Sequence, residues 1–70
     1  MGKIMTTLKE HREQKKLTQR ELAELVGVRR ETIVHLENNR YNPSLELALE
    51  IAKIFELPIE ALFRLNDKDE

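Results

Sequence analysis

The amino-acid sequence predicts an all-α fold, a compact bundle of five short helices. Apolar residues recur at three- and four-residue intervals along most of the chain, which is the period of an amphipathic helix. Start and stop signals for helices divide the chain into five segments, and no strand pattern is present. Seventy residues suffice for one domain. We expect it to span residues 1–66, followed by a frayed polar tail at 67–70.

The second and third helices are expected to be joined by a tight turn at Gly27. Thr18, followed three residues later by Glu21, has the pattern of a capping box and predicts the start of the second helix. Glycine enters the left-handed conformation without a steric penalty, so Gly27 is expected to end that helix. A third helix is predicted over residues 29–38. This pair is a helix-turn-helix arrangement, whose second helix can lie in a major groove.

The other three helices flank this pair. Helical spacing of apolar residues predicts the first over about residues 5–15. Pro43 bars a helix, and Ser44 is expected to cap the fourth helix, which continues to about Phe55. Pro58 suits the first turn of a fifth helix, whose apolar residues are Ile59, Leu62, Phe63 and Leu65.

Composition excludes several classes of function. The chain has no cysteine and only two separated histidines, too few for a metal site. No glycine-rich loop and no cluster of histidine, carboxylate and hydroxyl groups supports an enzyme or a cofactor. No apolar run approaches the roughly 18 residues of a membrane span. We therefore expect a soluble cytoplasmic protein that is not an enzyme and binds no small molecule.

Charge is divided unequally along the chain. Residues 1–40 carry nine Lys or Arg against six Glu, a balance of +3. Residues 41–70 carry three basic against seven acidic residues, a balance of −4. Such asymmetry indicates a polyanion-binding side in the first half. Taken alone it is a weak signal, because most such charges solvate helix faces.

Three segments resemble the Cro/repressor-type (XRE-like) helix-turn-helix regulators. They are LTQRELAELVGV (17–28), TIVHLENNR (32–40) and YNPSLELALEIAKIF (41–55), and the resemblance covers roughly residues 7–65. It implies a lambda-repressor-like fold that binds double-stranded DNA as a homodimer through the third helix. We expect a transcriptional regulator, a repressor of a short pseudo-palindromic operator. The alternative is a protein-interaction or antitoxin-like module whose acidic C-terminal half binds a partner protein.

The resemblance also implies roles for individual residues. Base contacts are expected from Arg29, Arg30, Glu31 and His35. Phosphate contacts are expected from Gln19, Thr32, Asn38 and Arg40. A largely buried ion pair is expected between Arg12 and Glu37. Candidates for a dimer interface are Phe55, Leu57, Ile59, Leu62 and Phe63, unless they close the monomer's own core.

Two of these assignments stay open. The family usually has Ser or Thr at position 29, where it caps the third helix, and this chain has Arg29. The cap is therefore expected to be weaker, or Arg29 has another role. Contact with a base and contact with a phosphate are then equally expected for Arg29. Gln19 is expected at a phosphate, and it could in addition brace a side chain of the third helix.

Overall fold

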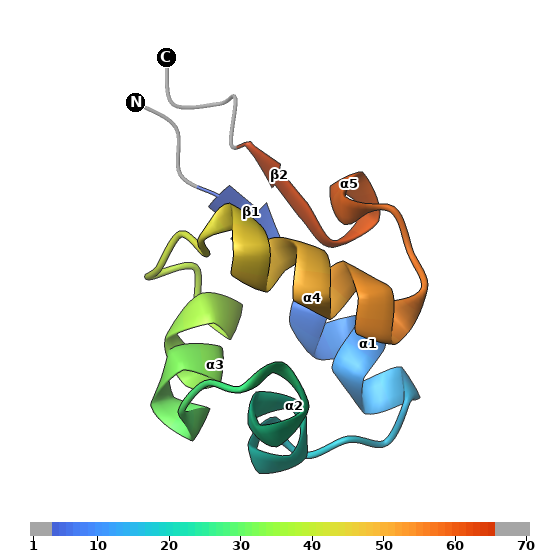
Figure 1. Ribbon diagram of the computed structural model, residues 1–70. Coiled ribbons are helices and arrows are strands. Elements are labelled where there is room, and N and C mark those ends of the chain that lie inside the picture. The colour runs from blue at the N-terminus through green and yellow to red at the C-terminus, as the bar shows by residue number, and fades with distance from the viewer. Residues whose placement is uncertain (1–3, 66–70) are drawn as a thin grey trace.

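The computed structural model describes residues 4–65, which form five helices and a two-stranded sheet (Figure 1). The elements in chain order are β1 (Ile4–Thr6), α1 (Leu8–Gln14), α2 (Gln19–Val26), α3 (Arg30–Glu37), α4 (Leu45–Phe55), α5 (Ile59–Leu62) and β2 (Phe63–Leu65). The predicted fold of five short helices is confirmed. The tail expected at 67–70 lies outside the described residues.

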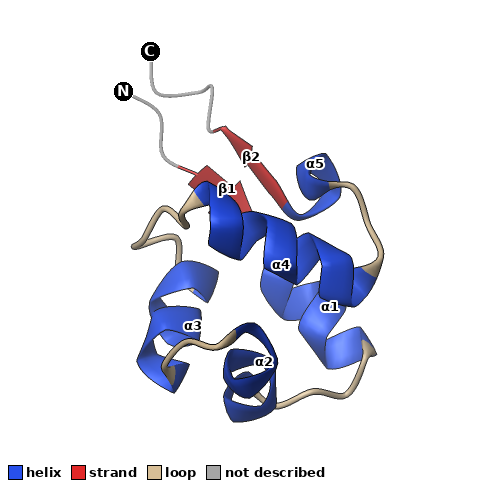
Figure 2. Ribbon diagram, viewed as in Figure 1, coloured by secondary structure: helices blue, strands red, loops and turns tan. Residues whose placement is uncertain are grey.

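The small sheet corrects the sequence prediction, which contained no strand. β1 and β2 pair antiparallel, with Met5 opposite Arg64 at the centre, so the two ends of the described chain lie side by side (Figure 2). As a result the first helix begins at Leu8, later than expected, and the fifth ends at Leu62. A three-residue strand is too short to display an alternating pattern, and its hydrogen-bond partner comes from the opposite end of the chain.

Thr6 explains why the strand gives way to a helix at this point. Its hydroxyl donates to the carbonyl oxygen of Leu62 at 2.7 Å and accepts from the backbone N–H of Leu8 at 3.0 Å. One side chain therefore joins the end of α5 to the start of α1. Local hydrogen bonding of this kind lets threonine compete with helical backbone bonds.

The predicted helix ends of α2 and α4 are confirmed. The hydroxyl of Thr18 accepts from the backbone N–H of Glu21 at 3.0 Å, and the Glu21 carboxylate accepts from the backbone N–H of Thr18 at 2.8 Å. Gly27 follows α2 in the left-handed conformation, with φ +74°. The Ser44 hydroxyl accepts from the backbone N–H of Leu47 at 3.1 Å. These caps satisfy backbone groups that a helix end otherwise leaves unpaired.

The core lies where all five helices meet. Its most deeply buried side chains come from every helix of the domain, and they are Leu8, Leu22, Ile33, Leu36, Ile51 and Leu62. Burying each such side chain contributes about 1.5–3 kcal/mol. Ala23 is also buried, and its small side chain lets α2 approach its neighbours closely. Packing against this core fixes how α2 and α3 are oriented on one side of the domain (Figure 1).

The loop after α3 is anchored to the sheet by two asparagines. Asn39 adopts φ 60°, as expected for a residue that stops a helix, and its side-chain oxygen accepts from the backbone N–H of Thr6 at 3.1 Å. The side-chain oxygen of Asn42 accepts from the backbone N–H of Ile4 at 3.2 Å. Both bonds cover the edge of β1 that faces away from β2. These two bonds therefore fix the position of the loop after α3 relative to β1.

Candidate nucleic-acid interface

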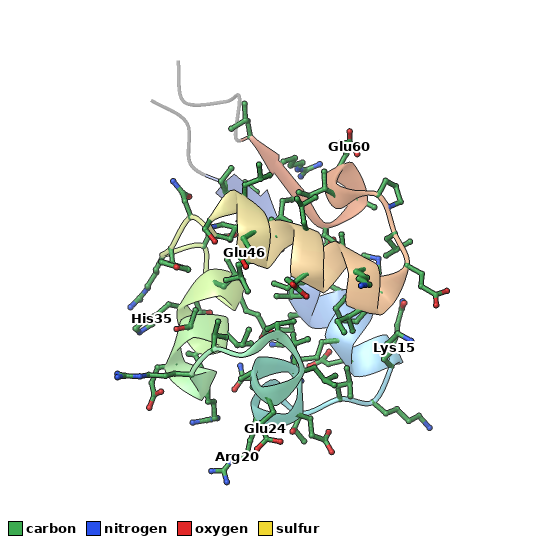
Figure 3. All side chains as sticks on the ribbon, in the orientation of Figure 1. Lys15, Arg20, Glu24, His35, Glu46 and Glu60 are labelled. Carbon is green, nitrogen blue, oxygen red and sulfur yellow. The ribbon has the colours of Figure 1, made fainter. Side chains whose placement is uncertain are left out.

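Helix α3 has one buried and one exposed face. Ile33 and Leu36 are 0% and 1% exposed, whereas Arg30, Glu31 and His35 are exposed. His35 projects away from the body of the domain (Figure 3). This division follows from the helical period, because positions three and four apart share a face. α3 therefore presents hydrogen-bonding side chains outward on a helix that the core holds in place.

The turn between α2 and α3 sets where this face begins. The backbone N–H of Val28 donates to the carbonyl oxygen of Ala23 at 3.0 Å, which closes the turn around Gly27. Arg29 follows in an extended conformation and caps α3 without any hydrogen bond from its side chain. Arg29 is exposed and directly precedes the first residue of α3, Arg30.

A charged pair inside the domain underlies this surface. Nε of Arg12 donates to Oε2 of Glu37 at 2.7 Å, and Nη2 of Arg12 donates to Oε1 of Glu37 at 3.3 Å. The Arg12 side chain is 10% exposed and the Glu37 side chain 3%. Nη1 of Arg12 also donates to the carbonyl oxygen of Leu17 at 2.7 Å. Within residues 4–65 no buried side-chain nitrogen or oxygen lacks a hydrogen-bond partner.

Gln19 connects this pair to the exposed end of α3. Its Nε2 donates to Oε1 of Glu37 at 3.1 Å, and its Oε1 accepts from Nη2 of Arg30 at 3.4 Å. The bond to Arg30 is the bracing contact that the resemblance allowed. Glu37 also belongs to α3, so Gln19 contacts both ends of this helix. Which side chains of α3 Gln19 contacts could not be read from local sequence, since Gln19 lies on α2.

The remaining candidates for phosphate contact lie along and beyond α3. Thr32 is half-buried in its first turn, whereas Asn38 and Arg40 are exposed after its last turn. The backbone N–H of Arg40 donates to the carbonyl oxygen of His35 at 3.0 Å, which keeps this segment against the helix. Gln19 stands at the N-terminus of α2. The fold thus brings the candidate groups to α3 and its two flanks.

Three of the five dimer-interface candidates are buried within the single chain. Phe55, Leu62 and Phe63 are 8%, 1% and 8% exposed and belong to the core. They have little surface to offer a second copy, because they close the monomer's own core. Leu57 and Ile59 are half-buried and pack against that core, so of the five candidates these two keep apolar surface for an interface.

Other kinds of site find no support within the part of the chain that the structure describes. Among residues 4–65 there is no group of three or more His, Asp or Glu side chains that could hold a metal ion. The same residues contain no helix with the length and apolar character needed to cross a membrane.

Comparison with known proteins agrees with this geometry. The helix-turn-helix family model matches residues 8–62. The chain belongs to the XRE-like helix-turn-helix family of transcriptional regulators. An uncharacterized HTH-type transcriptional regulator of Archaeoglobus fulgidus is 53% identical over 66 residues, covering 94% of each chain. One of Methanothermobacter thermautotrophicus is 51% identical over 65 residues, covering 91% of this chain and 94% of the relative.

A solved structure supports the same assignment for this regulator. The clp gene regulator ClgR of Corynebacterium glutamicum superposes with a TM-score of 0.70 at 31% identity. The match covers 74% of this chain and 55% of ClgR. This regulator is therefore a helix-turn-helix DNA-binding domain, in which α2 and α3 form the motif.

Proposed function

We propose that this regulator binds double-stranded DNA sequence-specifically, with α3 in the major groove. The observation that carries the proposal is the row of exposed hydrogen-bonding side chains on α3, namely Arg30, Glu31 and His35, opposite a buried apolar face. A guanidinium can donate to O6 and N7 of guanine, and a carboxylate can accept from N4 of cytosine. Arg29, beside the same end, is available for either a base or a phosphate.

Contacts to the DNA backbone are proposed on both flanks of α3. Arg40 and Asn38 follow its last turn, Thr32 lies in its first turn, and Gln19 begins α2. The N-terminus of a helix attracts phosphate through its unpaired backbone amides. Phosphate contacts supply affinity and register without sequence information, so they complement the base contacts made from α3.

We further propose a homodimer that acts in the cytoplasm as a repressor on a short pseudo-palindromic operator. Two-fold symmetry would place two copies of α3 in successive major grooves, about 34 Å apart. Leu57 and Ile59, half-buried where α4 passes to α5, are the residues proposed for the interface.

Selection of binding sites from random duplex DNA tests the proposal. The wild-type protein should enrich one short sequence, and mobility-shift titrations at two salt concentrations should show that its affinity for this sequence exceeds that for random duplex. Lys9→Ala, an exposed change on α1, is the matched control and should select the same sequence. The proposal fails if the wild type binds all duplexes equally.

One observation favours the protein-interaction alternative. Leu45 and Leu49 on α4 are 70% and 52% exposed, and with Glu46, Glu50 and Lys53 they line a shallow hollow of about 410 Å³. Exposed apolar surface rimmed by charge is typical of protein-binding sites. Leu49→Asp should leave DNA binding unchanged if α3 is the functional surface. Specific capture of a partner that Leu49→Asp abolishes, with no DNA preference in the wild type, would support the alternative.

A further inference from the structure

We infer that Glu37 is a positioning residue for base recognition, because its carboxylate determines which way the side-chain amide of Gln19 faces. The Gln19 amide in turn holds the guanidinium of Arg30. This inference rests on the proposed function, in which Arg30 contacts a base. It gives the buried ion pair a role in DNA recognition in addition to its role in folding.

The first step is the hydrogen-bonding chemistry of the three groups. A glutamine amide accepts at its oxygen and donates at its nitrogen, and the two orientations differ little in shape. An ionised carboxylate only accepts, so the nitrogen of Gln19 must face Glu37, at 3.1 Å. The oxygen is then turned toward Arg30, whose guanidinium only donates, at 3.4 Å. Rotating the amide by half a turn would oppose like groups at both contacts.

The second step is that Glu37 itself has no freedom to turn. Its side chain is 3% exposed, and both of its oxygens accept from Arg12, at 2.7 Å and 3.3 Å. Arg12 is tied in turn to the carbonyl oxygen of Leu17 at 2.7 Å. The orientation of the Gln19 amide is therefore set by groups fixed in the core.

The third step concerns Arg30, which is exposed and would otherwise sample many rotamers. Glu37 is the last residue of α3 and Arg30 the first, so Gln19 links the two ends of this helix from the start of α2. Only Nη2 of Arg30 is engaged by Gln19. A guanidinium has five N–H donors, so the others stay available for a bidentate contact with guanine. The bond to Gln19 limits the directions in which the remaining donors of Arg30 can point. This limit favours contact with one base pair over others.

The amide is removed by Gln19→Met, which keeps the length of the side chain and leaves the Arg12–Glu37 pair intact. We expect discrimination at the single base pair contacted by Arg30 to fall by roughly three- to tenfold, the size of one lost hydrogen bond. Discrimination at the other operator positions should change little, although affinity for all sequences should fall alike because Gln19 is also a proposed phosphate contact. The domain should stay folded, because Arg12 still pairs with Glu37. Gln14→Met, at the exposed end of α1, is the matched control and should alter neither property.

The role of Glu37 is tested by the double variant Arg12→Met/Glu37→Met. Removing both charges leaves no unpaired charge in the core, so the fold should survive. The same base pair should lose discrimination, although both substituted side chains are buried. Unchanged discrimination at every position in Gln19→Met, or in the folded double variant, would overturn the inference while leaving the proposed function intact. If the double variant does not fold, discrimination measured for Gln19→Met alone decides whether the inference holds. A wild type that selects no sequence would instead refute the proposed function itself.

Discussion

Arg12 and Glu37 stand twenty-five residues apart in the chain and share two hydrogen bonds, at 2.7 Å and 3.3 Å, between α1 and the end of α3. Both side chains are nearly inaccessible, with 10% and 3% of their surface exposed. The gain from a buried ion pair is offset by the free energy needed to desolvate both charges. Removing one partner, however, leaves the other charge buried and unpaired.

Arg12→Ala or Glu37→Ala should therefore lower the free energy of unfolding by roughly 3–5 kcal/mol. In a domain of this size such a loss approaches the whole stability, so both variants should be largely unfolded at room temperature. Urea denaturation followed by circular dichroism measures the effect. Lys9→Ala, on the exposed side of α1, should unfold like the wild type. Melting of both Arg12 and Glu37 variants within a few degrees of wild type would contradict the prediction.

Glu56→Gly should stabilise the domain by about 1 kcal/mol. Glu56 ends α4 in the left-handed conformation, with φ 56°, which disfavours any residue with a Cβ atom. Asn39 has a similar φ of 60°, but its side chain also accepts from the backbone N–H of Thr6. Asn39→Gly should therefore lose stability or gain none. Chemical denaturation of the two variants should give shifts of different size or sign, and equal stabilisation would show that the Asn39 bond contributes nothing.

Arg29→Ser should raise stability and weaken DNA binding at the same time. Arg29 occupies the N-cap position of α3 without a side-chain cap bond, and a serine there typically contributes about 1 kcal/mol. The same change removes a guanidinium that we propose lies against DNA. Arg20→Ser, an exposed change within α2, is the control for loss of positive charge. Melting curves measure the stability and mobility shifts the DNA affinity of both variants. The prediction fails if Arg29→Ser lowers DNA affinity no more than Arg20→Ser does.

Substitutions on and beyond α3 should separate into two classes. Arg30→Ala and His35→Ala should relax the preference at particular base pairs, by roughly 1–3 kcal/mol for a bidentate contact. Asn38→Ala and Arg40→Ala should weaken binding to all sequences alike. For Arg40→Ala, the dependence of log affinity on log salt should also fall by about one unit. Random-site selection with each variant distinguishes the classes. If Arg30→Ala kept the wild-type preference, Arg30 would belong to the phosphate class.

The regulator should bind a palindromic operator as a dimer, with Leu57 and Ile59 at the contact between copies. Leu57→Asp should lower dimer formation, because it places a charge on the apolar surface that a second copy would cover. The mass of the protein, measured at micromolar concentration both free and on the operator, provides the check. Lys53→Asp, a change on the outer face of α4, should leave the dimer intact. A monomer mass in both conditions would exclude the proposal.

Local chemistry allowed much of the fold to be predicted from the sequence. The capping box at Thr18, the left-handed Gly27 and the cap at Ser44 each depend on residues within one helical turn of one another. Such signals act through neighbouring backbone groups, so they can be recognised without knowing how the helices pack. The buried and exposed faces of α3 followed from the helical period in the same way.

The sheet could not be predicted in this manner. Ile4 and Leu8 have helical spacing, yet Ile4 belongs to β1 because its backbone meets β2 and the side chain of Asn42. Phe63 continues the apolar spacing of α5, yet it pairs with Thr6 in β2. For each short segment the helical preference is weak, and hydrogen bonds from a distant part of the chain decide its conformation.

The sequence alone determined that two short helices meet at Gly27 and that Arg29 and Arg30 stand at the start of the second. Tertiary structure decided which groups hold them there, because the bonds among Arg30, Gln19 and Glu37 join residues from different helices. It also decided that Phe55, Leu62 and Phe63 close the monomer's core. Helical periodicity identifies an apolar face. Which surface covers that face depends on how all five helices pack together.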